Sequence, residues 1–365
     1  LYHALLAPIS RLIPRGVETN LYALRLISVV IGLAAVWLAY LTARLVFPDS
    51  PLLRAGVPIF VAFQPQFSFE AAIVNHDILV IALFSLVLYL TLRGLRDGFS
   101  PRLELFLGFV VAAGLWTKTS FGLVLPVMVL GVWLAWRDRR REWGDWLDAW
   151  HWLAGSLVVT VLLPLLLVAP WFVRSFVLYG DPTGARRLQE IPEYGDQAQA
   201  YWAMLASKEF WRGRLEDFWG NYGWRQVPFD PGVYRLIWTL WAAAGIALLA
   251  FLIRALVRRR RHLPPMLSRF QWRALGLLAL SVVLLVYGVL YVGTIQFTQS
   301  RFAFPGMIGF AVLTLVGVDR WLPGRLRPLA LPLLLVLLVG LNVLVSLRFL
   351  IPFYYGPGGG GAISP

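Results

Sequence analysis

The sequence contains no cysteine and few charged side chains. Charged residues make up 14% of the 365 positions, whereas 59% are hydrophobic, and the mean hydropathy is +0.70. The lack of cysteine excludes disulfides and thiolate metal sites, and the scarcity of charge excludes a soluble domain of this length. The apolar runs are long and continuous, which excludes the alternating pattern of a transmembrane β-barrel. The sequence therefore predicts an all-α polytopic membrane protein, because helices satisfy their own backbone within lipid.

The charge that is present is mostly basic. There are 33 lysines and arginines against 19 acidic residues, which gives a net charge of +14. This excess does not indicate a nucleic-acid partner, because most arginines lie in short connections between apolar runs. Such placement is typical of cytoplasmic loops beside anionic lipids. We therefore expect an integral membrane protein, with the lipid bilayer as its partner.

The apolar runs predict about ten membrane spans. An interfacial helix at about 1–20 precedes them, and a Trp-rich amphipathic helix at about 142–151 follows the fifth span. The predicted spans cover about 21–46, 55–73, 78–93, 102–116, 119–136, 152–174, 235–257, 273–294, 302–318 and 329–350. The predicted parts of the chain are an N-terminal transmembrane module (1–174), an outer insertion with short helices (175–234), a C-terminal transmembrane module (235–350) and a flexible tail (351–365).

The basic connections predict one orientation. If residues 1–20 lie outside, the basic loops after the first, third, fifth, seventh and ninth spans all lie in the cytoplasm. The region of Asp77, the turn at Lys118, the insertion and the turn at 296–301 then all face the periplasm or exterior. We expect the functional site on that face.

Residues 64–77 are polar although they lie between two apolar runs. They include Glu70, Asn75, His76 and Asp77. Pro58 and the segment Gln64-Pro65-Gln66 interrupt the predicted second span. An ionisable group near membrane depth is costly, which makes this stretch a candidate functional site. The seven-residue separation of Glu70 and Asp77 would place both on one face if the helix were continuous.

Other elements supply cations, amides and aromatic rings on the same face. Lys118 lies in a short turn between spans, Gln299 and Arg301 lie in the last outer turn, and Trp219 and Trp224 lie in the insertion. Arginine and lysine suit a phosphate group, and a carboxylate can act as a general base toward a hydroxyl. These side chains together fit glycosyl transfer from a lipid-phosphate donor. The outer carboxylates leave a divalent cation open, although no ligand spacing requires one.

Each of these side chains also has a purely structural interpretation. Asp77 could cap the third span, and Glu70 and His76 could lie at the interface. Lys118 and Arg301 could anchor to lipid headgroups, and the tryptophans could simply pack. Their convergence on one face, under an orientation set by other residues, favours the functional interpretation.

Several segments resemble motifs of the GT-C superfamily of membrane glycosyltransferases, in the same order along the chain. They are Leu1-Tyr2-His3-Ala4-Leu5-Leu6-Ala7-Pro8, Val74-Asn75-His76-Asp77, Gly114-Leu115-Trp116-Thr117-Lys118-Thr119, Phe218-Trp219-Gly220-Asn221-Tyr222-Gly223-Trp224 and Gln299-Ser300-Arg301-Phe302-Ala303-Phe304-Pro305.

The resemblance is to protein O-mannosyltransferases, aminoarabinose transferases and a little-characterised bacterial branch. It implies an enzyme that takes a sugar from a polyprenyl-phosphate donor to an acceptor outside the cytoplasm. It implies a supporting acid at Asp77 and phosphate contacts at Lys118 and Arg301. The other residues that the motifs imply near the substrate are Tyr2, Asn75, His76, Gln299, Trp219 and Trp224.

The sequence departs from this pattern in two places. The acid most often assigned as catalytic base in these families precedes the first motif, and this chain begins at Leu1, so we expect an N-terminal truncation. A Gly-Arg-Tyr segment is replaced by Ser300-Arg301-Phe302. Glu70 is a weak candidate and is not assigned as the missing base.

Two other functions stay open at this point. A transporter or flippase of a lipid-linked or anionic substrate would also use broken helices, although no internal repeat is evident. A non-catalytic subunit that binds polyprenyl phosphate would fit a missing base. Transport without a glycosidic product would favour the former, and an upstream sequence without an acid would favour the latter.

Overall fold

The computed structural model describes residues 1–13, 16–143 and 146–356, without the side chains of Glu142, Trp143, Tyr194 and Trp224. This part of the chain is almost entirely helical, which confirms the all-α prediction. The one strand among the described residues is β1 (Val227–Pro228), which pairs with the segment just before it in the insertion.

The helices follow one another along the chain with the following bounds. They are α1 (Tyr2–Leu12), α2 (Val17–Val46), α3 (Pro51–Phe63), α4 (Pro65–Ala71), α5 (Asp77–Asp97), α6 (Pro101–Thr117), η1 (Thr119–Val124), α7 (Leu125–Trp143), α8 (Trp146–Leu157), η2 (Val158–Leu162), α9 (Leu163–Tyr179), α10 (Ala185–Gln189), α11 (Pro192–Gly195), α12 (Tyr201–Ala206), α13 (Lys208–Trp219), α14 (Tyr222–Arg225), α15 (Pro231–Arg260), α16 (Arg269–Gly293), η3 (Ser300–Gly306), α17 (Met307–Trp321), α18 (Arg327–Val345), η4 (Ser346–Leu350) and α19 (Ile351–Tyr355).

Eight helical segments in the described part are long and apolar enough to cross a membrane. They are Val17–Val46, Asp77–Asp97, Thr119–Arg141, Trp146–Tyr179, Pro231–Arg260, Arg269–Gly293, Ser300–Trp321 and Arg327–Tyr355. The other two predicted spans correspond to the shorter helices α3, of 13 residues, and α6, of 17 residues. The predicted break in the second span falls at Gln64, between α3 and α4, where Pro65 begins the new helix. The predicted interruption at Pro58 is wrong, because α3 continues through this residue.

The predicted separation of an amphipathic helix at 142–151 from a sixth span at 152–174 is wrong. Helices α8 and α9 instead form one 34-residue segment, joined by the π-helical turn η2. Pro164 is the second residue after this turn, and its backbone nitrogen has no hydrogen to donate to a regular helix. A π-turn accommodates that loss without ending the helix.

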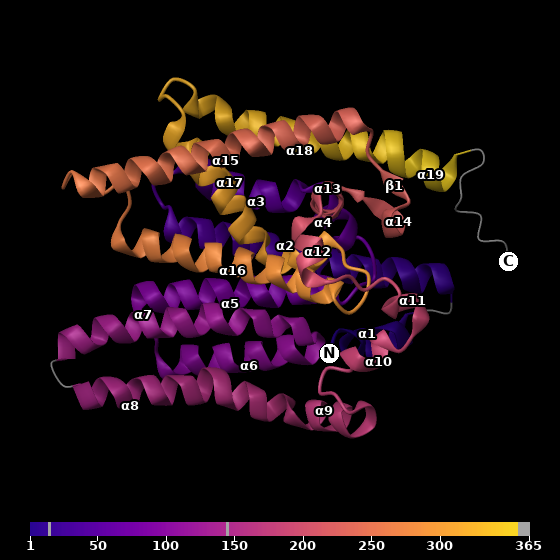
Figure 1. Cartoon of the computed structure of the whole chain (residues 1–365), viewed down its shortest axis with the longest axis horizontal. Coiled ribbons are helices and arrows are strands. Elements are labelled where there is room, and N and C mark those ends of the chain that lie inside the picture. Colours follow the sequence, from indigo (N-terminus) through magenta and orange to yellow (C-terminus); the bar gives the residue numbers. More distant parts are fainter. Residues whose placement is uncertain (14–15, 144–145, 357–365) are drawn as a thin grey trace.

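The long helices form a bundle with distinct ends (Figure 1). The end of α7, the start of α8 and the connections α15–α16 and α17–α18 lie at one end, which carries the basic segments 137–141 and 258–261. Helices α1, α10, α11 and α14 lie at the opposite end, which we call the insertion end. Helices α15 and α18 run along one side of the bundle, and α6 and α8 run along the other.

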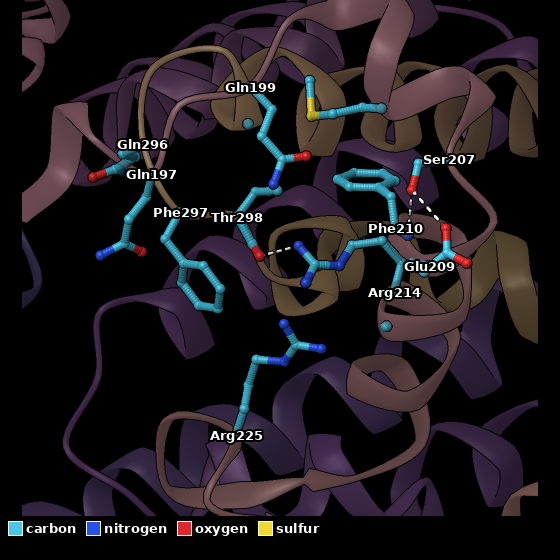
Figure 2. Close-up of a pocket in the computed structure, with 13 residues that line it drawn as sticks. Gln197, Gln199, Ser207, Glu209, Phe210, Arg214, Arg225, Gln296, Phe297 and Thr298 are labelled. Atoms are coloured by element: carbon cyan, nitrogen blue, oxygen red, sulfur yellow. Dashed lines mark hydrogen bonds between the residues drawn. The ribbon is translucent and has the colours of Figure 1, made fainter.

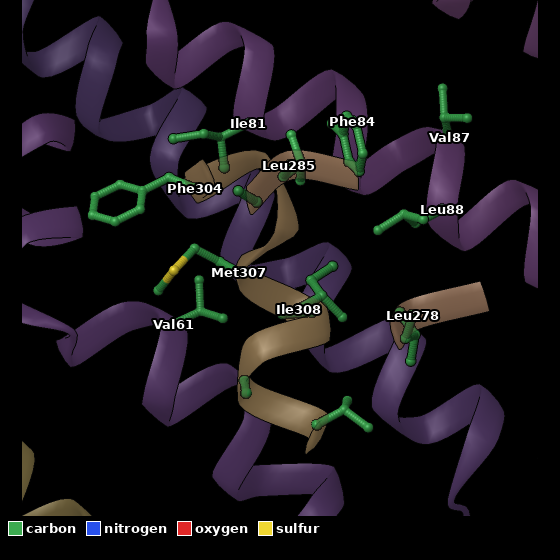
Figure 3. Packing of buried hydrophobic residues seen from close by; sticks show 14 of the residues in the cluster. Val61, Ile81, Phe84, Val87, Leu88, Leu278, Leu285, Phe304, Met307 and Ile308 are labelled. Atoms are coloured by element: carbon green, nitrogen blue, oxygen red, sulfur yellow. The ribbon is translucent and has the colours of Figure 1, made fainter. Parts of the chain in front are cut away.

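Helix α17 lies at the centre of the apolar core (Figure 3). Met307 and Ile308 at its start are buried beside Val61 of α3, Ile81 of α5 and Leu285 of α16. The continuous apolar contact between helices from both halves of the chain holds the polar residues of the insertion end on a fixed frame.

Two glycines on α17 allow its neighbours to approach closely. A Cβ atom at Gly309 would lie 2.8 Å from the carbonyl oxygen of Leu278 on α16. A Cβ atom at Gly317 would lie 2.3 Å from the backbone nitrogen of Leu248 on α15. Both separations are shorter than van der Waals contact allows, so the packing of α17 requires glycine at these positions.

Candidate active site

The site begins at the break between α3 and α4, where Gln64 is completely buried. Its side-chain oxygen accepts a 2.5 Å hydrogen bond from the backbone N–H of Phe67 and so caps α4. Its side-chain nitrogen donates to the carbonyl oxygen of Phe218 in the insertion. The residue that ends the apolar helix therefore also joins the membrane frame to the insertion.

Glu70 lies near the end of α4 with a side chain that is only 3% exposed. One carboxylate oxygen accepts from Gln66 at 3.2 Å and lies 3.5 Å from Nη1 of Arg301. The other oxygen accepts from the side chain of Asn75 at 3.1 Å. Burial raises the pKa of Glu70 above its usual value, and the positive charge of Arg301 opposes this rise.

Asp77 is the first residue of α5, and its carboxylate pairs with Lys118 at 2.6 Å. The two side chains are 10% and 24% exposed, respectively. The predicted role of Asp77 as a helix cap does not occur, because the N-cap of α5 is His76, without a side-chain capping bond. Burial lowers the pKa of His76, whose Nε2 lies 3.5 Å from Asp77.

The two acids converge although the helix between them is broken. Helix α4 ends at Ala71 and α5 begins at Asp77, so the helical spacing expected from the sequence does not apply. Asn75 in the intervening turn brings them together, because its amide nitrogen lies 3.1 Å from Glu70 and 3.5 Å from Asp77. Its oxygen also accepts from the backbone N–H of Asp77.

The two cations share an aromatic neighbour. Nζ of Lys118 lies 4.5 Å from the ring centre of Phe302, and the guanidinium of Arg301 lies 5.8 Å from the same centre. Together with Glu70 and Asp77 they form what we call the acid–cation centre, with two negative and two positive groups. An anion that displaces the two carboxylates could accept hydrogen bonds from both Lys118 and Arg301, while the acids remain close by.

A second polar cluster lies in the insertion and is connected to this centre. Asp217, only 4% exposed, pairs with Arg214 at 2.8 Å and with Arg225 at 2.9 Å. Burial raises the pKa of Asp217 although both arginines oppose the rise. The backbone N–H of Asn221 donates to Gln66 at 3.2 Å, and Gln66 in turn donates to Glu70. A hydrogen-bonded path therefore links the insertion to the acid–cation centre.

Three sequence-predicted residues lie outside the acid–cation centre, and the side chain of Trp224 lies outside the described residues. The buried hydroxyl of Tyr2 bonds to Ser28 at 2.8 Å, between α1 and α2. Trp219 is buried against Phe60, with ring centres 5.8 Å apart. Gln299 is buried at the N-cap of η3, two residues before Arg301.

Sequence reasoning missed several residues that complete these clusters. Gln66 and Asn221 were visible only as parts of polar stretches, and Phe302 appeared only as a departure from a motif. Arg214 and Arg225 had no signal of their own, because basic side chains in an outer insertion ordinarily face water. The burial of Arg214 comes from the packing of α13 on the loop before η3, which the sequence pattern does not encode, and Arg225 is half-buried beside it.

For a metal ion the described side chains give no indication. No group of three or more histidine, aspartate or glutamate side chains that could hold a metal ion occurs within the described ranges. This part of the chain therefore offers no set of ligands for the divalent cation that the sequence left open.

Comparison with known proteins supports one class for this fold and site. The match that was found is to a family of membrane glycosyltransferases of the GT-C kind. Residues 5–171, just under half of the chain, match the family model of the dolichyl-phosphate-mannose-protein mannosyltransferases. The matched part includes Glu70, Asp77 and Lys118. Searches of curated proteins and of solved structures found no match.

Proposed function

We propose that this protein transfers a sugar from a polyprenyl-phosphate donor to an acceptor at the insertion end of the bundle. The observation that carries the proposal is the acid–cation centre, in which Lys118 and Arg301 lie beside one aromatic ring and each pairs with a buried acid. Lysine and arginine are the side chains that bind phosphate groups most effectively.

Sidedness forms part of the proposal. The basic connections lie at the end of the bundle opposite the insertion. Basic loops favour the cytoplasmic side of a membrane. We therefore propose that the acid–cation centre opens to the non-cytoplasmic side, which is the periplasm for a bacterial inner membrane.

The proposed reaction is a substitution at the anomeric carbon of the donor sugar. The acceptor hydroxyl oxygen forms a bond to this carbon, and the bond from the carbon to the phosphate oxygen breaks. The polyprenyl phosphate leaves with the electron pair, stabilised by Lys118 and Arg301. The hydroxyl proton passes to a carboxylate acting as general base.

Glu70 suits this proton transfer better than Asp77. Its nearest cation lies 3.5 Å away, whereas Asp77 holds Lys118 at 2.6 Å. A raised pKa brings a carboxyl closer to the value at which a general base is most effective. We therefore propose Glu70 as proton acceptor, and Asp77 as the residue that positions Lys118.

An apolar groove supports a lipid-linked donor. A cavity of about 570 Å³ lies between α3, α15, α17 and α18, with a lining that is almost entirely hydrophobic. Its lining includes Phe60, Trp219, Leu240 and Leu334. Trp219 directly follows Phe218, whose carbonyl oxygen bonds to Gln64 at the start of α4. A polyprenyl chain in this groove would therefore approach the segment that carries Glu70.

The test uses the purified protein in nanodiscs with a panel of polyprenyl-phosphate monosaccharides that includes the mannose compound. We expect the release of polyprenyl phosphate with at least one donor, and a loss of at least tenfold in Arg301→Ala and in Asp77→Asn. Melting temperatures measured in parallel verify that both variants are folded. Parent-level turnover in both variants would refute the site assignment, and movement of the donor across liposomes without a glycosidic product would favour a transporter.

A further inference from the structure

A separate cavity of about 240 Å³ lies in the insertion, between α12, α13 and the loop that precedes η3 (Figure 2). The side chains of Gln197, Gln199 and Gln296 lie around it. Arg214 and Arg225 also line it, with the ring of Phe297 beside them. The cavity thus combines amides, guanidinium groups and an aromatic face.

The interior of this cavity has more positive than negative charge. Asp217 is the one buried carboxylate paired with Arg214 and Arg225, so two cations share a single acid. Glu209 also lines the cavity, but it is exposed at the rim, where water screens its charge. An anionic group would therefore balance the second guanidinium.

Arg214 is held with unused hydrogen-bonding capacity. Its side chain is 9% exposed; Nη1 donates to the carbonyl oxygen of Thr298, and Nη2 lies 2.8 Å from Asp217 in an ion pair. Its Nε is buried and has no hydrogen-bond partner among the described residues. A buried donor without a partner is costly, and such groups are often reserved for a ligand.

Arg225 is held in place by features that are unfavourable for stability. Its backbone has φ of +70°, in the left-handed region that residues other than glycine rarely adopt. Its guanidinium lies so close to Gly213 that a Cβ atom there would be 2.7 Å from Nη2. Strained conformations of this kind tend to occur where a side chain must be positioned for function.

We infer that this cavity binds an acidic saccharide, with its carboxylate or phosphate group on Arg225 and Arg214. The guanidinium fork matches the oxygens of both groups. The glutamine amides can donate to and accept from sugar hydroxyls, and Phe297 offers a face for the ring. The inference names the acceptor class of the proposed transferase, so its place in the reaction rests on that proposal.

The cavity is linked to the acid–cation centre, as the binding site of an acceptor would need to be. Thr298, which accepts from Arg214, lies three residues before Arg301 of the acid–cation centre. From the other side, Asn221 and Gln66 form the hydrogen-bonded path to Glu70. An acceptor held here would contact the loop that leads directly into η3, the element that carries Arg301.

The test is direct binding to the full chain in nanodiscs, measured by calorimetry without turnover. The probes are glucuronate, glucose 6-phosphate, inorganic phosphate and uncharged glucose. We expect one or both acidic sugars to bind at least tenfold more tightly than glucose and more tightly than inorganic phosphate. The tighter of the two identifies a carboxylate or a phosphate as the anionic group.

Variants separate this site from simple surface charge. Arg225→Gln should weaken binding of the acidic sugar at least tenfold, and Gly213→Ala should weaken it severalfold because the added Cβ displaces the guanidinium. Arg212→Gln is the matched control, since Arg212 is an exposed arginine of α13, the helix that carries Gly213 and Arg214, and its replacement should leave binding unchanged. Melting temperatures show whether each variant is folded, and Gly213→Ala keeps the test valid if Arg225→Gln unfolds.

Three results would overturn the inference. They are acidic sugars that bind no better than glucose, inorganic phosphate that binds as tightly as the acidic sugars, and parent-like binding in folded Arg225→Gln or Gly213→Ala. None of these results would affect the release of polyprenyl phosphate from the donor, which tests the proposed function separately.

Discussion

Replacement of Glu70 by glutamine tests the acid–cation centre in the greatest detail. Glutamine keeps the size of the side chain, and its one amide oxygen can accept from either Gln66 or Asn75, but it removes the negative charge 3.5 Å from Arg301. Arg301 then faces the donor phosphate without a competing carboxylate. We expect the Glu70→Gln protein to bind the donor more tightly and to turn it over more slowly.

The structure sets the size of the binding effect. Two unit charges 3.5 Å apart interact by about 4 to 5 kcal/mol at an effective dielectric constant of about 20. Most of this energy is offset by changes in solvation when a buried pair is separated. We therefore expect a gain of about 1.4 kcal/mol in donor binding, which is roughly tenfold in Kd. The loss of the general base should lower kcat by about a hundredfold.

The dependence on pH gives the sign of the effect. Glu70 has a raised pKa, so it is neutral below that pKa and negative above it. Donor affinity of the parent should therefore fall as pH rises through this pKa, while kcat should rise over the same range. In Glu70→Gln neither donor affinity nor kcat should change with pH over this range. Donor affinity should stay at the value that the parent reaches at low pH.

The assay is equilibrium binding of polyprenyl-phosphate mannose in nanodiscs, followed with pH, together with initial rates. This donor is a phosphodiester, so its charge stays constant, unlike that of a phosphomonoester, which titrates near pH 6. His76→Gln is the control for the histidine beside Asp77, whose pKa is lowered by burial. Weaker donor binding in Glu70→Gln, or an unchanged pH profile, would refute the reasoning.

Two other variants test the positioning of Lys118 and the packing of the frame. Asp77→Asn should lower transfer at least tenfold and cost about 2 to 3 kcal/mol of unfolding free energy, because it leaves Lys118 largely buried without its carboxylate. Adding Lys118→Met should recover thermal stability but not transfer, and additive losses of stability would contradict the pairing. Gly317→Ala should cost about 1 to 3 kcal/mol because the new Cβ meets the backbone of α15. Gly245→Ala, at a helical glycine with open space, should not destabilise, and equal melting temperatures for the two glycine variants would contradict the close packing.

The helical frame and the polar ends of the helices could be predicted from the sequence. Long apolar runs predicted the class of fold, and the proline at position 65 predicted the break at Gln64. The junction of α8 and α9 was missed, because a π-turn before Pro164 let one helix continue where hydropathy indicated two. Whether a proline breaks or only distorts a helix depends on the tertiary contacts around it.

The site could be predicted only in part. The sequence identified Glu70, Asp77, Lys118 and Arg301 as candidates, but its argument from helical spacing did not apply. The acids meet through Asn75 in a turn rather than along one helix face. The pairing of each acid with a particular cation joins positions 41 and 231 residues apart, and it depends on how the helices pack rather than on any local pattern.

The most direct test of the central claim is a structure of the protein in nanodiscs with polyprenyl phosphate bound. The account predicts that the phosphate lies between Lys118 and Arg301, beside the ring of Phe302, with the lipid chain in the apolar groove next to Trp219. A phosphate bound at Arg214 and Arg225 instead, with Lys118 and Arg301 still paired to their acids, would contradict it.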